Sequence, residues 1–376
     1  MRSLTKSLVS TLAIVVITAF LLEIAVRLVD GRPVFTIRNW VAQTLEANTE
    51  NHSSRYDPGL GWSAKPNLDI QGIFLDDPNI PDMSDVVVTT DARGFRSTGP
   101  MPDGGADLSP IVTIGDSFTW GSEVGDLDTY PAHLQAITGR PIVNAAYGGW
   151  GTDQMWLRMN EVADSMTPGL IVLSPLTNDV LRNAYRRYGR AFKPYFVLEG
   201  DTLAVRNLPS PRNSTRPEDV GYWQSWFGWS YLVFFGARAL GLEEVWINRN
   251  LLTDRVHDNE VAVDIACRLL GETASFSKAR DIPVVLALIY SGGEVATGER
   301  HWFTQQYLDC AKEVGLPVID TFEAFLEASQ TEDDFPASRY RVWKNGNVAH
   351  MNSAGNRLVA ETIASQLRES GLIEAF

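Results

Sequence analysis

The sequence predicts an α/β protein, a three-layer α/β/α sandwich with a mainly parallel sheet. From residue 111 onward, short apolar runs alternate with longer segments of helical pattern. The runs are continuously apolar rather than alternating, as in strands that are buried on both faces. The expected strands are Ile111–Ile114, Ile142–Asn144, Leu170–Leu173, Pro283–Ile289 and Pro317–Ile319. The expected helices are Thr129–Ile137, Thr152–Asp164, Trp302–Val314 and Ser353–Arg368.

Residues 1–30 differ from the rest and predict a transmembrane helix that acts as a signal anchor. Arg2 and Lys6 precede the apolar run Leu8–Leu22, which continues beyond Glu23. About 19 residues of this kind are enough to cross a bilayer. No small-x-small cleavage site precedes Arg27, which favours an uncleaved anchor over a cleaved signal peptide. The basic residues at the start predict that the remaining chain lies outside the cytoplasm. A buried helix of a soluble protein is the alternative.

Two further segments interrupt the α/β pattern. Residues 31–105 form a lead-in segment, rich in proline and glycine, that we expect to pack on the main domain, residues 106–376. It contains a strand candidate, Val86–Thr90, and a turn at Gly94. Residues 183–260 form an insertion with eight aromatic residues close together. They are Tyr222, Trp223, Trp226, Phe227, Trp229, Tyr231, Phe234 and Phe235. The insertion could be a lid over a pocket, an aromatic core of its own, or a contact with the bilayer surface.

Composition and missing motifs narrow the functions. A net charge of −14 argues against nucleic acid as a partner. The glycine cluster at Gly148–Gly151 fails as a dinucleotide fingerprint because Gln154 stands at its last position. Phosphate-loop and zinc-protease motifs are absent too, so neither cofactor nor metal is expected. Cys267 and Cys310 are expected as buried thiols, with one disulfide as the alternative in an oxidising compartment.

Ser117 and His350 are the candidates for nucleophilic chemistry. Ser117 directly follows a buried strand, at the edge of an open sheet where ligands bind, although such a residue can simply cap a helix. It does not lie in a Gly-x-Ser-x-Gly elbow, because Thr119 occupies the last position. His350 lies in a loop that runs into the last helix, and the other histidines read more simply as structural. These are His52, His133, His257 and His301.

Four blocks of the sequence resemble the SGNH (GDSL-type) hydrolases, in the order that this family has them. The blocks are Gly115-Asp116-Ser117-Phe118, Asn144–Gln154 with Gly149, Thr177-Asn178-Asp179, and His350 with Asn352 and Gly355. The apolar amino terminus and Gly94-Phe95-Arg96 are similar to membrane-anchored bacterial members. The resemblance implies a flavodoxin-like sandwich and a serine hydrolase without a metal. It makes Ser117 the nucleophile and His350 the general base. The backbone N–H groups of Ser117 and Gly149 and the amide of Asn178 would form the oxyanion hole.

One position departs from the family pattern. The family usually has an aspartate three residues before the histidine, whereas this chain has Asn347. An amide can orient the imidazole but cannot balance its positive charge. The alternatives are a Ser117–His350 dyad oriented by Asn347, another acid such as Asp320, or a low activity. Asp320 is more simply a helix cap.

The sequence therefore predicts an anchored extracytoplasmic esterase. Its substrate is expected to be an acyl ester of a small molecule or a cell-envelope carbohydrate, with acetyl as the expected acyl group. One alternative is an O-acyltransferase that passes the acyl group to a sugar hydroxyl. The other is a catalytically silent carbohydrate-binding protein, for which Asn347 is the motive.

Overall fold

The computed structural model describes residues 2–29, 34, 53–73, 80–189, 191–200, 202–212, 221–242, 246 and 253–373. His52 lies outside the described residues. The chain divides into two compact units. One comprises Met1–Thr49, Gly189–Ala191 and Arg212–Asp254, and the other Glu50–Tyr188, Phe192–Pro211 and Arg255–Phe376.

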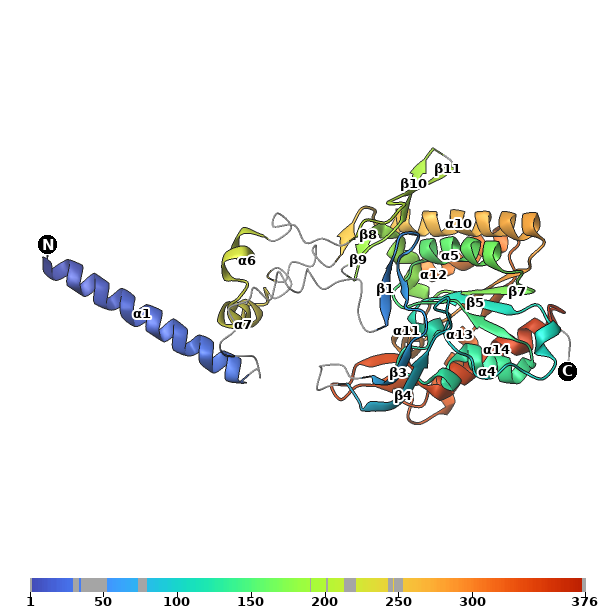
Figure 1. Ribbon diagram of the computed structural model, residues 1–376, viewed down its shortest axis with the longest axis horizontal. Helices are drawn as coiled ribbons and strands as arrows, with labels where there is room; N and C mark the ends of the chain where they lie inside the picture. Colours follow the sequence, from blue (N-terminus) through green and yellow to red (C-terminus); the bar gives the residue numbers. More distant parts are fainter. Residues whose placement is uncertain are drawn as a thin grey trace. The chain divides into compact units, whose positions relative to one another are not determined.

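A parallel sheet of five strands forms the centre of the larger unit (Figure 1). Its order is β14-β13-β7-β5-β6, and every neighbouring pair is parallel. Taken in chain order this is 2-1-3-4-5, the flavodoxin-like order, and the predicted fold class is confirmed. The strands are β5 (Ile111–Gly115), β6 (Ile142–Asn144), β7 (Leu170–Ser174), β13 (Val284–Leu288) and β14 (Val318–Asp320).

Helices cover both faces of this sheet, which explains the continuously apolar strands. Helices α5 (Thr152–Ser165), α10 (Asn259–Arg280) and α12 (Trp302–Glu313) lie on one face. Helices α4 (Tyr130–Thr138), α13 (Phe322–Thr331) and α14 (Ser353–Glu369) lie on the other. Ile111, Val112 and Ile114 have no exposed surface. Burying a side chain of this size contributes roughly 1.5–3 kcal/mol, so the three residues fix β5 at the centre of the fold.

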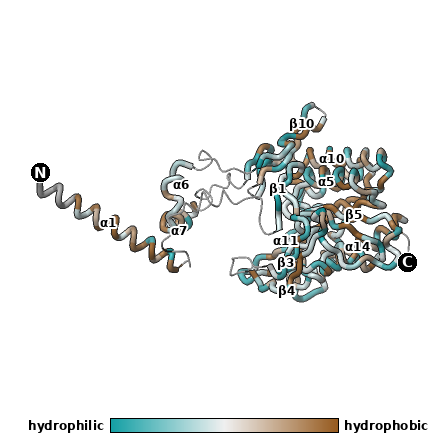
Figure 2. The backbone as a smooth tube through the Cα atoms, viewed as in Figure 1, coloured by the Kyte–Doolittle hydropathy of each residue, from teal (hydrophilic) through white to brown (hydrophobic). Residues whose placement is uncertain are grey.

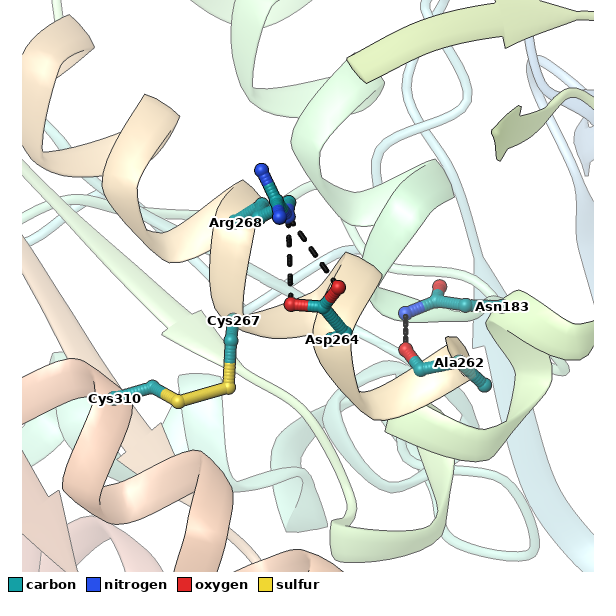
Figure 3. Close-up of a disulfide and its surroundings, with 6 residues drawn as sticks. All are labelled: Asn183, Ala262, Asp264, Cys267, Arg268 and Cys310. Atoms are coloured by element: carbon teal, nitrogen blue, oxygen red, sulfur yellow. Dashed lines mark hydrogen bonds and ion pairs between the residues drawn. A yellow bond between two sulfur atoms is a disulfide. The ribbon is translucent and has the colours of Figure 1, made fainter. Parts of the chain in front are cut away.

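A disulfide joins two helices of one layer. Cys267 on α10 and Cys310 on α12 are bonded to each other (Figure 3). The expectation of two buried thiols was wrong, because the helices pack side by side and bring the two Cα atoms to 5.5 Å.

The lead-in residues form two antiparallel hairpins. The first pairs β1 (Ser54–Asp57) with β2 (Gly61–Ala64), and the second pairs β3 (Asp69–Ile73) with β4 (Met83–Thr89). Trp62 on β2 donates its indole N–H to the carbonyl of Gly148 at 2.9 Å. The carbonyl of Trp62 accepts the indole N–H of Trp150 at 3.0 Å. The first hairpin is thus fastened to the glycine cluster after β6.

Short elements complete the larger unit. They are η1 (Gly105–Asp107), α3 (Ser117–Trp120), η2 (Asp126–Asp128), η3 (Thr177–Ala184), α11 (Gly292–Thr297), β15 (Tyr340–Val342) and β16 (Val348–Met351). The strands β8 (Tyr185–Tyr188), β9 (Ala191–Phe192), β10 (Tyr195–Glu199), β11 (Thr202–Arg206) and β12 (Asp254–Arg255) come from the predicted insertion.

The described part of the insertion divides between the two units. Hairpin β10–β11 belongs to the larger unit, where Phe196 packs with Ile265 and Leu269 of α10. Helices α6 (Tyr222–Phe227) and α7 (Tyr231–Ala239) belong to the smaller unit and contain no buried residue. The described aromatic residues therefore do not form a buried core of their own.

The first helix, α1 (Arg2–Val29), is also in the smaller unit. Its stretch Val9–Val29 is 21 residues long and is apolar enough to cross a membrane. Figure 2 shows the hydrophobic colour along this helix. The observation concerns length and composition, which a signal sequence shares.

Candidate active site

Ser117 lies at the carboxyl end of β5, where the strand turns sharply into α3. The turn is held by Asp116, whose Oδ1 accepts the backbone N–H of Phe118 at 2.8 Å. Gly115 is required here because a Cβ atom would lie 2.0 Å from Thr119 Oγ1 and 2.3 Å from the carbonyl oxygen of Ser174. This close approach leaves Ser117 at the junction of β5 and β7, the switch point at which open α/β sheets bind ligands.

His350 reaches Ser117 from the other end of the sequence. Its Nε2 lies 2.9 Å from Ser117 Oγ, within hydrogen-bond distance. The histidine stands on β16, in the hairpin before α14, and not in a loop as the sequence suggested. Its ring packs on Phe118 with centroids 5.0 Å apart. The structure therefore brings together the predicted nucleophile and base in the geometry that proton transfer requires.

The partner of the second imidazole nitrogen is Glu123, which the sequence interpretation missed. Glu123 Oε1 lies 2.9 Å from His350 Nδ1. Asn347 is exposed in the turn of the β15–β16 hairpin, where its carbonyl accepts the N–H of Trp343. Glu123 thus takes the place that we expected for Asn347. Asp320 pairs with Arg300 and accepts the N–H of Phe322 at the start of α13, so it is a helix cap.

Glu123 is held in an unusual backbone conformation. Its φ of 69° lies in the left-handed region, which costs a residue other than glycine on the order of 1 kcal/mol. The side chain is buried, and its Oε2 has no hydrogen-bond partner within the described ranges. A buried carboxylate with a free oxygen is well suited to stabilise the imidazolium that forms during catalysis. The one feature of the sequence that could have pointed to Glu123 is its place as an acid in the glycine-flanked stretch Gly121–Gly125.

Arg96 fastens the loop that carries Glu123. The guanidinium donates to the carbonyls of Trp120 at 2.8 Å, Gly121 at 2.6 Å and Val124 at 2.6 Å. Its Nε donates to Asp126 Oδ1 at 3.0 Å. The residue is 2% exposed. The guanidinium of Arg96 therefore holds the backbone before and after Glu123. The turn at Gly94 directly precedes Arg96, so its role is to place this side chain.

We predict that Arg96→Lys lowers kcat by about 10²-fold with little change in KM, because the single nitrogen of a lysine cannot reach the four partners that the planar guanidinium holds from three nitrogens, and Glu123 is then misplaced. Ester hydrolysis by the purified variant checks this. The matched control is Arg93→Lys, since Arg93 is exposed and its ion pair is with nearby Asp91 on the surface. The effect should nearly vanish when Glu123→Gln is already present. Equal losses in both backgrounds would show that Arg96 does not act through Glu123.

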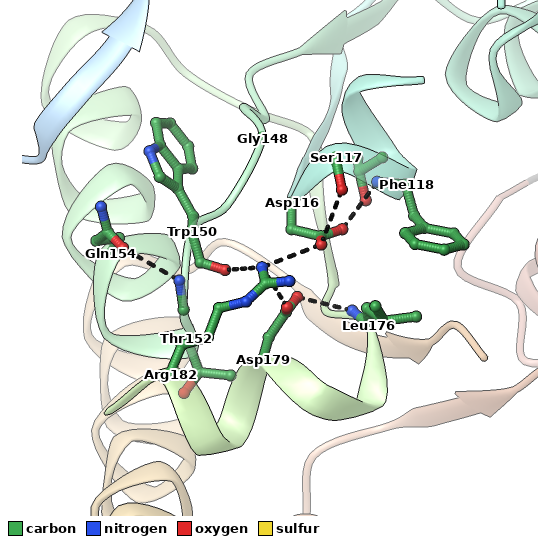
Figure 4. Close-up of polar contacts among 12 residues, drawn as sticks. Asp116, Ser117, Phe118, Gly148, Trp150, Thr152, Gln154, Leu176, Asp179 and Arg182 are labelled. Atoms are coloured by element: carbon green, nitrogen blue, oxygen red, sulfur yellow. Dashed lines mark hydrogen bonds and ion pairs between the residues drawn. The ribbon is translucent and has the colours of Figure 1, made fainter. Parts of the chain in front are cut away.

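A partly buried arginine, Arg182, whose side chain is 13% exposed, connects the segments that carry the other site residues (Figure 4). Its Nη1 lies 3.1 Å from Asp116 Oδ2, 2.6 Å from Asp179 Oδ1 and 2.7 Å from the carbonyl of Trp150. Asp116 Oδ2 also lies 3.2 Å from Ser117 Oγ. Burial raises the pKa of Asp179 well above its ordinary value, although Arg182 opposes this shift. No motif in the sequence pointed to Arg182, because its partners come from three separate segments.

The predicted oxyanion residues, Ser117, Gly149 and Asn178, lie on these three segments. Gly149 has a φ of 81°, a conformation that favours glycine. A Cβ on its neighbour Gly148 would be 3.6 Å from Ser117 Cβ, so this loop runs directly beside the nucleophile. Asn178 is exposed in the first turn of η3, after β7. The preceding Thr177 is held by a 2.5 Å hydrogen bond to buried Glu294. The oxyanion roles of Ser117, Gly149 and Asn178 remain predictions.

We expect Asn178→Ala to lower kcat by about 10²–10³-fold, because an oxyanion donor acts on charge that develops only in the transition state. KM should change little. The matched control is Asn347→Ala, which truncates another exposed asparagine. Steady-state hydrolysis of p-nitrophenyl acetate measures both. A wild-type kcat in Asn178→Ala would remove Asn178 from the oxyanion hole.

The comparison with known families decides the assignment. The profile of the GDSL-like lipase/acylhydrolase family matches residues 113–358. The chain belongs to this family. The match begins within β5 and ends within α14, and it includes Ser117, Glu123 and His350. The protein is thus an esterase of the SGNH type, and the resemblance to the SGNH (GDSL-type) hydrolases is confirmed.

Solved structures with similar folds include two esterases of this kind. An acetylxylan esterase from Geobacillus stearothermophilus has 16% identity and a TM-score of 0.40, covering 71% of this chain and 97% of its own. The acetyl xylan esterase AlAXEase has 15% identity and a TM-score of 0.39, with coverages of 69% and 99%. An α/β hydrolase from the metagenome of Lake Arreo, Spain, has 17% identity and a TM-score of 0.40, with coverages of 71% and 97%. No curated protein sequence matches the chain.

Within the described ranges, no group of three or more His, Cys, Asp or Glu side chains is arranged to hold a metal ion.

Proposed function

We propose that this esterase cleaves short acyl esters, chiefly acetyl esters, through a Ser117–His350–Glu123 triad. The observation that carries the proposal is the continuous line of hydrogen bonds from Ser117 Oγ through both imidazole nitrogens to Glu123. Its two distances, both 2.9 Å, suit a proton transfer from the hydroxyl to Nε2.

The reaction proceeds in two halves. His350 Nε2 takes the hydroxyl proton while Ser117 Oγ bonds to the ester carbonyl carbon, and Glu123 stabilises the imidazolium. The oxyanion is held by the N–H groups of Ser117 and Gly149 and by the amide of Asn178. His350 then gives its proton to the alcohol oxygen, whose bond to the acyl carbon breaks. Water, activated by His350, attacks the acyl-serine and releases the acid, which restores the hydroxyl of Ser117.

The preference for a short acyl group rests on large rings beside the oxyanion loop. From the position that a Cβ on Gly149 would take, the Trp62 indole lies 3.6 Å away and the Tyr188 ring 4.0 Å away. Trp62 is 7% exposed, and its N–H is fixed on Gly148, so the ring cannot swing away without losing this bond. Such walls leave little room for a long chain.

The proposed location is outside the cytoplasm, with α1 as the membrane anchor. The length and apolarity of Val9–Val29 and the basic residues before it support this orientation. The disulfide between Cys267 and Cys310 supports it independently, because disulfides persist mainly in oxidising compartments. An esterase fixed at this surface would meet acylated carbohydrates of the cell envelope, which we propose as its substrates.

The structure favours hydrolysis over the two alternatives. The His350 side chain is 28% exposed, so water can reach the acyl-serine, whereas an acyltransferase needs to keep water out. The catalytically silent alternative was suggested by Asn347, which stands where the family has an aspartate. Glu123 supplies a carboxylate to His350, so this reason for a silent protein no longer holds.

The test uses the full chain in nanodiscs. Hydrolysis of p-nitrophenyl acetate, butyrate and octanoate is measured, together with acetate release from acetylated oligosaccharides. We expect kcat/KM to fall at least tenfold from acetate to octanoate, with a fluorophosphonate probe blocking all turnover. An octanoate rate equal to the acetate rate would refute the short-acyl preference. Transfer of the acetyl group to an added sugar in preference to water would instead establish the acyltransferase.

A further inference from the structure

We propose that α6 and α7 form an interfacial membrane segment, docked on the anchor helix α1, that inserts its aromatic rings among lipid headgroups. The inference rests on the proposed role of α1 as the anchor. It assigns the aromatic part of the insertion to the bilayer rather than to a lid or a core.

The docking contact is built on Glu23, an acid within the apolar stretch of α1. Its carboxylate accepts the backbone N–H groups of Tyr231 at 3.0 Å and Leu232 at 2.9 Å, and the hydroxyl of Ser230 at 2.7 Å. These groups form the amino-terminal end of α7, whose first N–H groups have no partner inside the helix. Glu23 is 7% exposed. A charge that would be costly in a membrane span is thus compensated by α7.

Arg27, one helical turn further along α1, completes the contact. It donates to Glu23 Oε1 at 2.6 Å and to the carbonyl of Trp229 at 2.7 Å. Its guanidinium also lies 5.0 Å from the centre of the Tyr231 ring. The charges of Glu23 and Arg27 compensate each other and bind the start of α7. Together they specify where α7 contacts the anchor helix.

The depth of this contact follows from helix geometry. Glu23 lies about 9 Å along the axis from Val29, the last residue of α1, at the usual rise per residue. The whole stretch Val9–Val29 is about 30 Å long, the thickness of the hydrocarbon core. The start of α7 therefore lies in the outer leaflet, about 9 Å inside the end of this stretch, a depth that interfacial amphipathic helices reach.

The surface of α6 and α7 suits that depth. Six aromatic residues are exposed: Tyr222, Trp223, Trp226, Phe227, Trp229 and Phe235. The sequence of α7, YLVFFGARA, has a single charge, Arg238, in its last turn. Tryptophan and tyrosine concentrate at membrane–water interfaces, where the ring is in an apolar layer and its polar atom in a wet one. Water is a poor surrounding for such a surface, whereas the bilayer that holds α1 is directly adjacent.

The experiment places a fluorescent label on single introduced cysteines, since both native cysteines are in the disulfide. Trp226→Cys reports on α6, and Ile17→Cys reports on the middle of α1. The matched control is Trp302→Cys, an exposed tryptophan on α12. Each labelled full chain is reconstituted in phosphatidylcholine nanodiscs, with or without lipids that carry a spin label near the headgroup or deep in the acyl chain.

We expect the headgroup spin label to quench more than half of the emission at position 226 and hardly any at position 302. The deep spin label should quench position 17. Quenching at 17 without quenching at 226 would overturn this inference and leave the anchor intact. No quenching at 17 would refute the anchor itself.

A second variant tests the docking contact. Glu23→Ala removes the acceptor for the amino terminus of α7, so quenching at position 226 should fall by at least half while quenching at 17 is retained. Unchanged quenching at 226 would show that Glu23 does not hold α7 in place.

Discussion

Glu123→Gln should lower kcat by about 10⁴-fold, the loss seen when the acid of a serine-protease triad becomes an amide. The amide cannot balance the imidazolium, and its NH₂ group favours the wrong tautomer of His350. Hydrolysis of p-nitrophenyl acetate at saturating substrate gives kcat directly. The expectation depends on the 2.9 Å contact between Glu123 Oε1 and His350 Nδ1.

The control for this prediction is Asn347→Asp. If Asn347 were the orienting residue, a carboxylate at this position would raise the rate, as the sequence pattern suggests. With Glu123 in place, we expect kcat to stay within twofold of the wild type. A rise with Asn347→Asp, together with an active Glu123→Gln, would restore Asn347 to the triad and refute our assignment.

The variant Glu123→Gly tests whether Glu123 is needed for catalysis alone or also for the stability of the fold. Glycine adopts the left-handed conformation without strain, and the change removes a buried carboxylate oxygen that has no hydrogen-bond partner among the residues that the structure describes. We expect the free energy of unfolding to be no lower than that of the wild type, measured by urea denaturation, although turnover is lost. A clear destabilisation would mean that Glu123 is needed for folding, and the kinetic comparison would then rest on Glu123→Gln.

Ser117→Ala should have the largest effect, a loss of about 10⁶-fold in kcat, as for removal of a catalytic serine in other hydrolases. The variant lacks the nucleophile, so no acyl-serine can form, and labelling by a fluorophosphonate should disappear. Acetate release measured over long incubations sets the residual rate.

Ser122→Ala is the matched control, because Ser122 lies in the same loop and its hydroxyl has no role in the proposed mechanism. It should retain both labelling and turnover. The melting temperature of Ser117→Ala should stay close to that of the wild type, since alanine suits the first turn of α3. Labelling that persists in Ser117→Ala would identify a different nucleophile.

Local patterns in the sequence were enough to predict the core of this protein. The apolar runs gave β5, β6 and β7 almost to the residue, and the helices predicted at 152–164 and 353–368 are α5 and α14. Strands buried on both faces leave a continuous apolar signal, and each helix has its own periodicity. Ser117 and His350 were found because the nucleophile and the base lie in short motifs.

The residues that complete the site were decided by tertiary structure. Whether Glu123 or Asn347 reaches His350 depends on a left-handed backbone turn and on the direction of the β15–β16 hairpin, neither of which has a local signature. Arg96 holds backbone carbonyl groups of a loop some 25 residues away. Every residue type has such a carbonyl, so the sequence of the loop does not reveal the contact. The bond between Cys267 and Cys310 required two helices to pack side by side. Sequence alone specified the five strands of the sheet, four of the six helices that cover it and the two reactive side chains, but it gave no expectation for α10 and α13. The partners that orient the reactive side chains depend on distances that only the folded chain sets.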